Sequence, residues 1–258
     1  MGKKFKPFLI IILAVELIVL FGLMLQGDNV VVLNPKGLIA SQQRDLIVAA
    51  TLLMLLVVVP VFVLTFFITY KYRETNRKAK YSPDWDSNKL LEFIWWAIPC
   101  CIIFILGMIT WNSSHSLDPF KPLAAEAKPL KVQVIALDWK WLFIYPEQGV
   151  ASVNYLQIPI NRPIDFEITS DAPMNSFWIP QLGGQIYAMA GMSTQLHLMA
   201  DQVGAYNGSS ANISGRGFAG MHFIVKAGLQ SEFDNWIEAA SQNRNTLDAS
   251  SYKQLAEP

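Results

Sequence analysis

Residues 138–146, which read Asp-Trp-Lys-Trp-Leu-Phe-Ile-Tyr-Pro, carry the most distinctive local pattern in the chain. Trp139, Trp141, Phe143 and Tyr145 alternate with other residues, and a proline follows them, which is typical of a strand that ends in a turn. Two interpretations fit these rings: they pack on a sheet and at a membrane surface, or they form an aromatic surface that docks a partner. The alternation alone does not choose between them. Partner docking is the functional prediction for this stretch.

The strand pattern continues on both sides of this stretch. Short alternating stretches run from Leu130 onward and are separated by turn residues. The apolar residues expected to share strand faces are Val132, Val134 and Ala136; Ile164, Phe166 and Ile168; Leu196 and Leu198; and Phe223 and Val225. Short strands at this spacing predict an all-β sandwich or barrel. After Gly228, the spacing of Phe233, Trp236 and Ile237 predicts a short C-terminal helical extension.

The first half of the chain has the composition of a membrane segment. Of the 258 residues, 52% are hydrophobic and only 16% are charged, whereas soluble domains carry about a quarter charged residues. Three apolar runs, at residues 8–26, 46–70 and 93–111, each approach the ~20 residues that a membrane-spanning helix needs. The sequence therefore predicts a transmembrane helical hairpin spanning about 46–70 and 93–111, with a possible third helix before it.

The charges between the runs set the orientation. Residues 71–80 contain five lysine or arginine residues, and basic loops stay in the cytoplasm. Everything after Trp111 is then expected on the opposite side of the membrane. The first run, within residues 1–27, fits either a signal peptide or an uncleaved membrane anchor. No small-residue cleavage site follows it, which favours the anchor, although Glu16 near its centre is costly in lipid.

Ordinary catalytic and metal-binding patterns are missing from the sequence. Cys100 and Cys101 are adjacent and lie within an apolar run, so neither a disulfide framework nor a zinc cluster is predicted. The three histidines are far apart; His197 is expected to be an exposed residue on the outer face of a strand, and His222 beside Met221 makes a poor copper site without a thiolate. The formal net charge of zero gives no indication of a nucleic-acid partner.

The apolar hairpin, the tryptophan-rich stretch and a late glycine-rich loop together resemble subunit II of the heme–copper oxidases over nearly the whole chain. In the cytochrome c oxidases of that family, the resemblance implies a cupredoxin-like domain whose binuclear copper centre uses cysteine, histidine and methionine ligands. The matching positions in this sequence are Asn175, Ser210, Asn212, Ser214, Phe218 and Met221. Serines replace the two thiolates, asparagine and phenylalanine replace the histidines, and only Met221 keeps a ligand side chain. We call these six residues the vestigial copper positions.

The loss of these ligands distinguishes two branches of the family. Serine hydroxyls are poor ligands for a copper pair, and phenylalanine cannot coordinate a metal. The chain therefore resembles the quinol oxidase branch, as do residues 34–37 (Asn-Pro-Lys-Gly) and 215–221 (Gly-Arg-Gly-Phe-Ala-Gly-Met). Some members of that branch are lipoproteins with a cysteine a few residues before the Asn-Pro-Lys-Gly stretch, where this chain has Asp28; lipid anchoring is not predicted.

Glu92 is the candidate for proton uptake. By the topology above, it lies at the cytoplasmic edge of the second predicted helix. A carboxylate there can simply face water. The resemblance instead implies a position at the mouth of a proton-uptake path of subunit I, because an ionisable group at a helix end against a partner can relay protons.

The resemblance implies a proton-pumping respiratory quinol oxidase that oxidises ubiquinol and reduces oxygen to water. This chain would be a non-redox accessory subunit in the bacterial inner membrane, with membrane lipid, a heme-bearing subunit I and other subunits as partners. Hemes, copper and quinol would all lie in subunit I, with no cofactor here. The alternatives are a copper-carrying subunit for electron transfer and a membrane-tethered periplasmic binding or assembly domain. The predicted segments are 1–27, the hairpin at 28–111, the periplasmic domain at 112–228 and the extension at 229–258.

Overall fold

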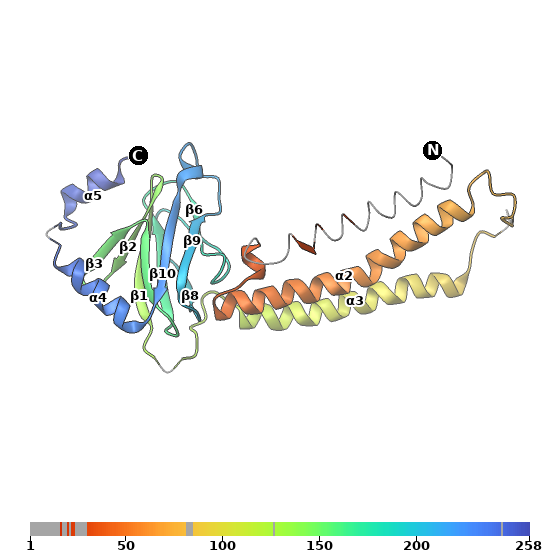
Figure 1. Ribbon diagram of the computed structural model, residues 1–258, viewed down its shortest axis with the longest axis horizontal. Helices are drawn as coiled ribbons and strands as arrows, with labels where there is room; N and C mark the ends of the chain where they lie inside the picture. The colour runs from red at the N-terminus through yellow and green to blue at the C-terminus, as the bar shows by residue number, and fades with distance from the viewer. Residues whose placement is uncertain are drawn as a thin grey trace. The chain divides into compact units, whose positions relative to one another are not determined.

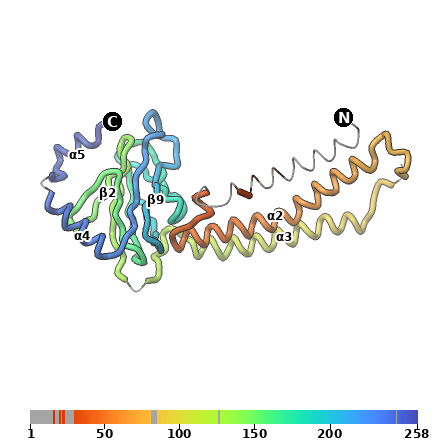
Figure 2. The backbone as a smooth tube through the Cα atoms, viewed as in Figure 1, coloured from red at the N-terminus to blue at the C-terminus, as the bar shows by residue number. Residues whose placement is uncertain are grey.

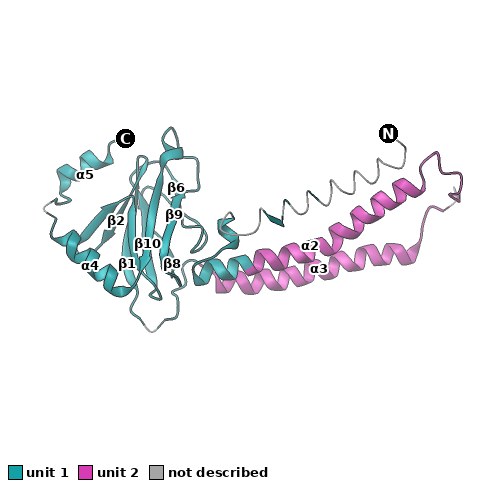
Figure 3. Ribbon diagram, in the orientation of Figure 1, with its two compact units in different colours: residues 1–44, 119–258 teal, residues 45–118 magenta. Residues whose placement is uncertain are grey.

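The structure, a computed structural model, describes residues 16, 20, 22–23, 30–80, 85–125, 127–243 and 245–258. It divides into two compact units, residues 1–44 with 119–258 and residues 45–118 (Figure 3). The predicted anchor or signal peptide at residues 1–27 lies almost wholly outside the described residues, so it stays a prediction.

The two long apolar runs form helices, as the sequence predicts. Helix α2 covers Leu38–Lys71 and helix α3 covers Lys89–Ser116, and both are long and apolar enough to cross a membrane. They extend beyond the apolar runs at both ends. Most of their side chains are exposed, including every residue of α2 from Val58 onward. Apolar side chains that are exposed along two such helices are expected to contact lipid or another membrane protein.

A regular stripe of half-buried residues runs along α3. Pro99, Ile102, Leu106 and Ile109 recur every three or four residues, the spacing of one helix face. The two helices lie alongside each other within residues 45–118 (Figure 1). The stripe is the face along which α3 is least exposed in this hairpin.

Ten short strands form a sandwich of two five-stranded sheets (Figure 1). One sheet has the order β3-β2-β1-β5-β8 and the other the order β4-β10-β9-β6-β7. The pairs β1–β5 and β4–β10 are parallel, and the other neighbouring pairs that make up these sheets are antiparallel. The strands are β1 Leu130–Leu137, β2 Lys140–Tyr145, β3 Val150–Val153, β4 Tyr155–Pro159, β5 Ile164–Ser170, β6 Asn175–Trp178, β7 Ile186–Ala188, β8 Thr194–Leu198, β9 Gly204–Ser210 and β10 His222–Gly228.

The sandwich core consists of the apolar faces that the sequence predicts. All ten alternating residues named above are buried, from Val132 on β1 to Val225 on β10. Aromatic rings fill the space between the two sheets: Phe177 stacks on Phe223 at a centroid distance of 5.2 Å, and Phe166 lies 5.3 Å from Phe177. Strand periodicity of two predicts this arrangement, because alternate side chains point to the same face.

The chain just before α2 is fastened to the sandwich. Gly37 forms an isolated β-bridge with Ala200, and the backbone of Lys36 pairs with Gln181 and Asp201 at 2.8 and 2.9 Å. A side chain at Gly37 would place its Cβ 2.4 Å from the carbonyl oxygen of Met199, so only glycine permits this approach. The Asn-Pro-Lys-Gly stretch therefore holds the start of α2 against the β-domain.

The C-terminal extension is helical, as predicted. Helix α4 covers Gln230–Ser241, and helix α5 covers Ala249–Ala256 (Figure 2). Phe233 is buried, and Trp236 lies 5.3 Å from the ring of Tyr145 and 6.0 Å from that of Tyr155. The aromatic residues of α4 thus extend the sandwich core beyond its last strand.

Candidate functional site

The vestigial copper positions meet at one end of the sandwich, where β6 begins and β9 ends. Ser210 donates its hydroxyl proton to Oδ1 of Asn175 over 2.9 Å, and both residues are buried. The Asn175 amide nitrogen donates to the carbonyl oxygen of Pro173 at 2.8 Å. The two residues that the resemblance aligns with a histidine and a thiolate are therefore joined by a neutral hydrogen bond.

The loop between β9 and β10 carries the remaining positions. The Asn212 side chain donates to the carbonyl oxygen of Met174 at 3.0 Å, and the backbone nitrogen of Ser210 donates to the carbonyl of Met221 at 3.2 Å. Met221 is fully buried. Phe218 begins a 3₁₀ turn, η3 (Phe218–Gly220), and is half-buried. These contacts tie the loop to the segment before β6.

Ser214 is the exception in this cluster. Its hydroxyl oxygen is buried and has no hydrogen-bond partner among the described residues, as is also true of the Ser176 hydroxyl next to Asn175. Buried hydroxyl groups are usually hydrogen-bonded, because leaving one unpaired costs free energy. Polar atoms therefore remain in a region that is otherwise packed with aromatic rings.

This donor set does not fit a binuclear copper centre. Copper in such centres is held by soft thiolate and imidazole ligands, whereas these positions offer neutral hydroxyl and amide groups, one thioether and a phenyl ring. The Asn175 oxygen is already occupied by the Ser210 hydroxyl. No group of three or more histidine, cysteine, aspartate or glutamate side chains that could hold a metal ion occurs in the described part of the chain.

Trp139 covers the glycine-rich loop. It lies between β1 and β2 with a backbone φ of +65°, a conformation that non-glycine residues rarely adopt. A Cβ added at Gly217 would lie 2.2 Å from Cγ of Trp139, and one added at Gly215 would lie 2.5 Å from the same indole ring. The indole therefore packs directly on the backbone of residues 215–217, which explains why this loop is rich in glycine.

The prediction that the aromatic stretch docks a partner is wrong for three of its four residues. Trp141, Phe143 and Tyr145 are fully buried on β2. Trp141 and Phe143 contact Phe177 and Phe223 across the core, at centroid distances from 5.2 to 6.2 Å. Trp139 is half-buried and packs on the glycine-rich loop. The rings pack on the sheet, because alternate positions of β2 face the other sheet.

Tyr145 also links the two sheets. Its hydroxyl donates to the carbonyl oxygen of Gln157 and accepts from the backbone nitrogen of the same residue, each at 2.9 Å. Gln157 lies on β4, in the opposite sheet. Burial raises the pKa of the Tyr145 phenol well above its usual range. Tyr145 therefore remains a neutral structural group.

The expectation that His197 is exposed is wrong. Its side chain is only 9% exposed, and Nδ1 lies 3.5 Å from the Asp165 carboxylate on β5.

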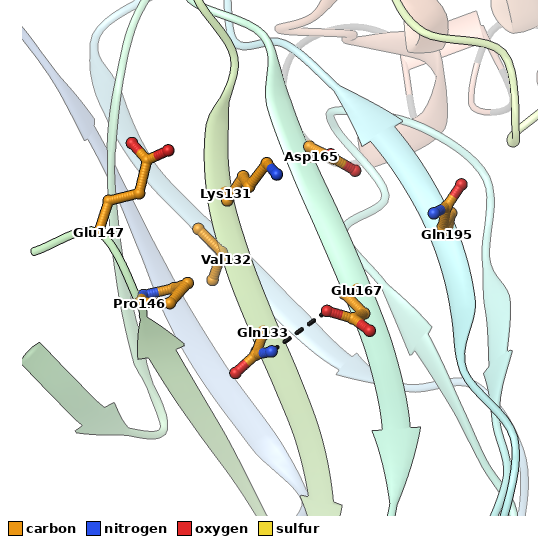
Figure 4. A pocket seen from close by; sticks show the side chains of 8 residues that line it. All are labelled: Lys131, Val132, Gln133, Pro146, Glu147, Asp165, Glu167 and Gln195. Carbon is orange, nitrogen blue, oxygen red and sulfur yellow. Dashed lines mark hydrogen bonds between the residues drawn. The ribbon is translucent and has the colours of Figure 1, made fainter. Parts of the chain in front are cut away.

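The neighbouring outer face of β1, β5 and β8 forms an open hollow lined by Lys131, Val132, Gln133, Pro146, Glu147, Asp165, Glu167 and Gln195 (Figure 4). Gln133 donates to Glu167 across it at 3.2 Å. Rows of paired polar side chains are ordinary on a solvated sheet face. His222 is exposed on β10.

Glu92 lies in the first turn of α3. Asn88 caps this helix, accepting hydrogen bonds from the backbone nitrogens of Leu90 and Leu91 at 3.1 Å. Glu92 is half-buried. A carboxylate in this turn is also stabilised by the helix dipole, so its position alone does not assign a proton-transfer role.

Comparisons with known proteins agree with this architecture. Residues 146–228 match the family described as cytochrome c oxidase subunit II, periplasmic domain. The chain is 51% identical over 236 residues to the cytochrome bo(3) ubiquinol oxidase subunit 2 of Pseudomonas putida, covering 92% of this chain and 75% of that protein. It is 41% identical over 258 residues to the quinol oxidase subunit 2 of Bacillus subtilis, covering 99% of this chain and 79% of that protein.

A solved structure, the periplasmic domain of subunit II of the cytochrome oxidase of Bradyrhizobium japonicum, aligns with 47% of this chain and 98% of its own length, at 21% identity and a TM-score of 0.44. The two relatives that are 41% and 51% identical and match over most of this chain establish its family without this structure. This chain is a membrane protein with a periplasmic domain, and it belongs to the quinol oxidase subunit 2 family.

Proposed function

We propose that this chain is the non-redox subunit 2 of a proton-pumping respiratory quinol oxidase in a bacterial inner membrane. The complex oxidises ubiquinol and reduces oxygen to water. The observation that supports the proposal is the hydrogen bond between Asn175 and Ser210, because the two residues that the resemblance aligns with a histidine and a thiolate are neutral and bonded to each other. The relatives that match over most of the chain bear quinol oxidase names.

The role of the chain is then structural. Quinol delivers its electrons from within the membrane, so a metal port in the periplasmic domain is not required. The α2–α3 hairpin would pack against a heme-bearing subunit I, and the β-domain would cap the periplasmic face of that subunit. Hemes, copper and the quinol site are assigned to subunit I, and no cofactor is assigned to this chain.

The experiment that tests this role measures quinol oxidation by the purified complex. Variants that fill the vestigial positions with apolar residues, such as Ser214→Ala, are expected to leave the rate of electron transfer unchanged. A fall in that rate, with heme content and subunit content preserved, would contradict a non-redox role for this end of the sandwich. The matched control is Ser209→Ala on β9, which lies outside the vestigial positions.

We also propose that Glu92 takes part in proton uptake at the cytoplasmic face. Its placement in the first turn of α3, half-buried and beside the polar segment that precedes the helix, supports this role. Glu92→Ala is expected to slow turnover of the purified oxidase several-fold, while Glu92→Asp retains most of the activity. Glu74→Ala, which removes an exposed glutamate from the basic segment after α2, is the control. Unchanged turnover in Glu92→Ala would contradict the proposal.

A further inference from the structure

The C-terminal helix α5 is too short to be stable by itself. It has eight residues, whereas isolated helices shorter than about 12 residues are marginal in water. None of its residues is fully buried; Ser251, Tyr252, Leu255 and Ala256 form a half-buried side, and the other residues of the helix are exposed. Apolar packing alone is therefore a weak reason for α5 to be ordered, and polar contacts to the sandwich become decisive.

Lys140 supplies the first of these contacts. Its ammonium group donates to the carbonyl oxygens of Leu255 at 2.9 Å and Glu257 at 2.6 Å. The last carbonyls of a helix have no partner within the helix, and they carry partial negative charge. The lysine therefore caps the C-terminus of α5 from β2.

Tyr252 supplies the second contact. Its hydroxyl donates to Oδ2 of Asp171 at 2.8 Å, a charge-assisted bond. Asp171 follows β5 directly, and its backbone nitrogen donates to Ala136 on β1. The helix is thus bound at two points, one at the start of β2 and one just after β5.

Both anchors are linked through the chain to the loops that carry the vestigial copper positions. Lys140 follows Trp139, whose indole packs on Gly217 in the β9–β10 loop. Asp171 begins the loop that leads to Asn175 and includes Met174, whose carbonyl receives the Asn212 side chain. The rings of α4 pack on Tyr145 and Tyr155 and not on either anchor. Helix α5 is therefore attached to the domain separately from α4.

We propose that α5 is a clasp that joins the β1–β2 turn to the β5–β6 loop and so holds closed the end of the sandwich that carries the vestigial copper positions. The clasp keeps Trp139 pressed on the glycine loop and keeps the segment before Asn175 in place for its bond with Ser210. This inference rests on the contacts of α5 and not on the proposed function.

Hydrogen exchange on the full chain within the purified oxidase tests the clasp. Lys140→Met and Tyr252→Phe each remove one anchor with little change of side-chain volume. Either variant is expected to exchange about tenfold faster in α5 and at two backbone amides, those of Asp171, which donates to Ala136, and Ala211, which donates to Ser176 beside Asn175. Tenfold is the factor for the roughly 1.5 kcal/mol of a bond to a charged group. The double variant is expected to exchange faster in α5 than either single variant, because both bonds break in the same opening of the helix and the losses of separate contacts add.

Two control variants and one reference strand, β4, distinguish loss of the clasp from a general loss of stability. Lys253→Met removes an exposed lysine from α5, and Tyr187→Phe removes the hydroxyl of an exposed tyrosine on β7; neither is expected to change exchange. The amides of β4 are expected to keep wild-type rates in every variant. The proposal is overturned if α5 exchanges faster while Asp171 and Ala211 do not, if neither variant releases α5, or if β4 accelerates by the same factor.

Discussion

Ser210 supports the end of the sandwich through hydrogen bonds of its hydroxyl group. Its hydroxyl bonds Asn175, and the backbone nitrogen of Ser176 donates to the same oxygen at 3.4 Å. At the position that the resemblance aligns with a bridging thiolate, the side chain therefore makes local hydrogen bonds. The residue therefore supports the loop without offering a thiolate.

Replacing Ser210 with alanine leaves the buried Asn175 oxygen without its closest donor. The expected cost is about 1–3 kcal/mol of the free energy of unfolding, the usual range for an unpaired buried polar group. Urea unfolding of the full chain, followed by tryptophan fluorescence, measures it. Ser209→Ala on the same strand is the control, since Ser209 is half-buried on the opposite face of β9. Equal midpoints for the two variants would contradict this account of Ser210.

Gly217 is required by the ring that lies on it. Gly217→Ala would place a methyl group 2.2 Å from Cγ of Trp139, so the indole or the loop must move. We expect a loss of about 1–3 kcal/mol, typical of overpacking, and a red-shifted tryptophan emission. Gly220→Ala is the matched control, because a Cβ there meets no atom within 4 Å. A Gly217→Ala variant as stable as Gly220→Ala would show that Trp139 does not cover the loop.

At the scale of elements, Tyr145 joins β2 to β4 across the sandwich through the backbone nitrogen and the carbonyl oxygen of Gln157. Tyr145→Phe keeps the ring packing against Phe233 and Trp236 but leaves two buried backbone groups without this partner. The expected loss is about 1–3 kcal/mol, measured by urea unfolding at neutral pH. Tyr187→Phe is the control, because Tyr187 is exposed.

The same residue makes the stability depend on pH in alkali. Burial raises the folded pKa of Tyr145 above its unfolded value of about 10, so the folded chain favours the neutral phenol. Its contribution is fully present below pH 10 and is lost as the pH rises further. Tyr145→Phe should therefore flatten the decline in stability above pH 10. An unchanged alkaline slope would mean that Tyr145 is not protected in the folded state.

Sequence periodicity predicted the helices and strands better than it predicted the contacts between them. Alternating apolar residues, such as those around Val132 and those around Phe166, identified buried strand faces, and the apolar runs identified α2 and α3, because both signals are local. The burial of His197 and of Tyr145 depends on groups from other strands, such as Asp165 and Gln157, which no local pattern reveals. The anchors of α5 are equally distant, since Lys140 and Leu255 are 115 residues apart in sequence.

The vestigial copper positions illustrate both sides of this limit. The resemblance to the oxidase family implied which six residues stand where ligands would be, and the structure joins Asn175, Ser210 and Asn212 by hydrogen bonds. The sequence did not reveal that Trp139 covers the neighbouring loop. The signal that could have found it was the pair of glycines at 215 and 217, which a large ring on the loop requires.

At the scale of the whole molecule, the hairpin and the β-domain serve different environments. The helices present apolar side chains along most of their surface, and the sandwich carries its own core. A membrane hairpin with a periplasmic domain whose residues do not fit a copper pair agrees with the proposed subunit, which supports an oxidase without carrying electrons. The central claim is therefore about copper.

The most direct test is a metal analysis of the purified oxidase, counted per heme and accompanied by absorption and electron paramagnetic resonance spectra. The account predicts only the copper of subunit I, with no signal from a binuclear copper centre. Additional copper in stoichiometric amount, bound to this chain and giving such a signal, would contradict it and assign electron transfer to the periplasmic domain.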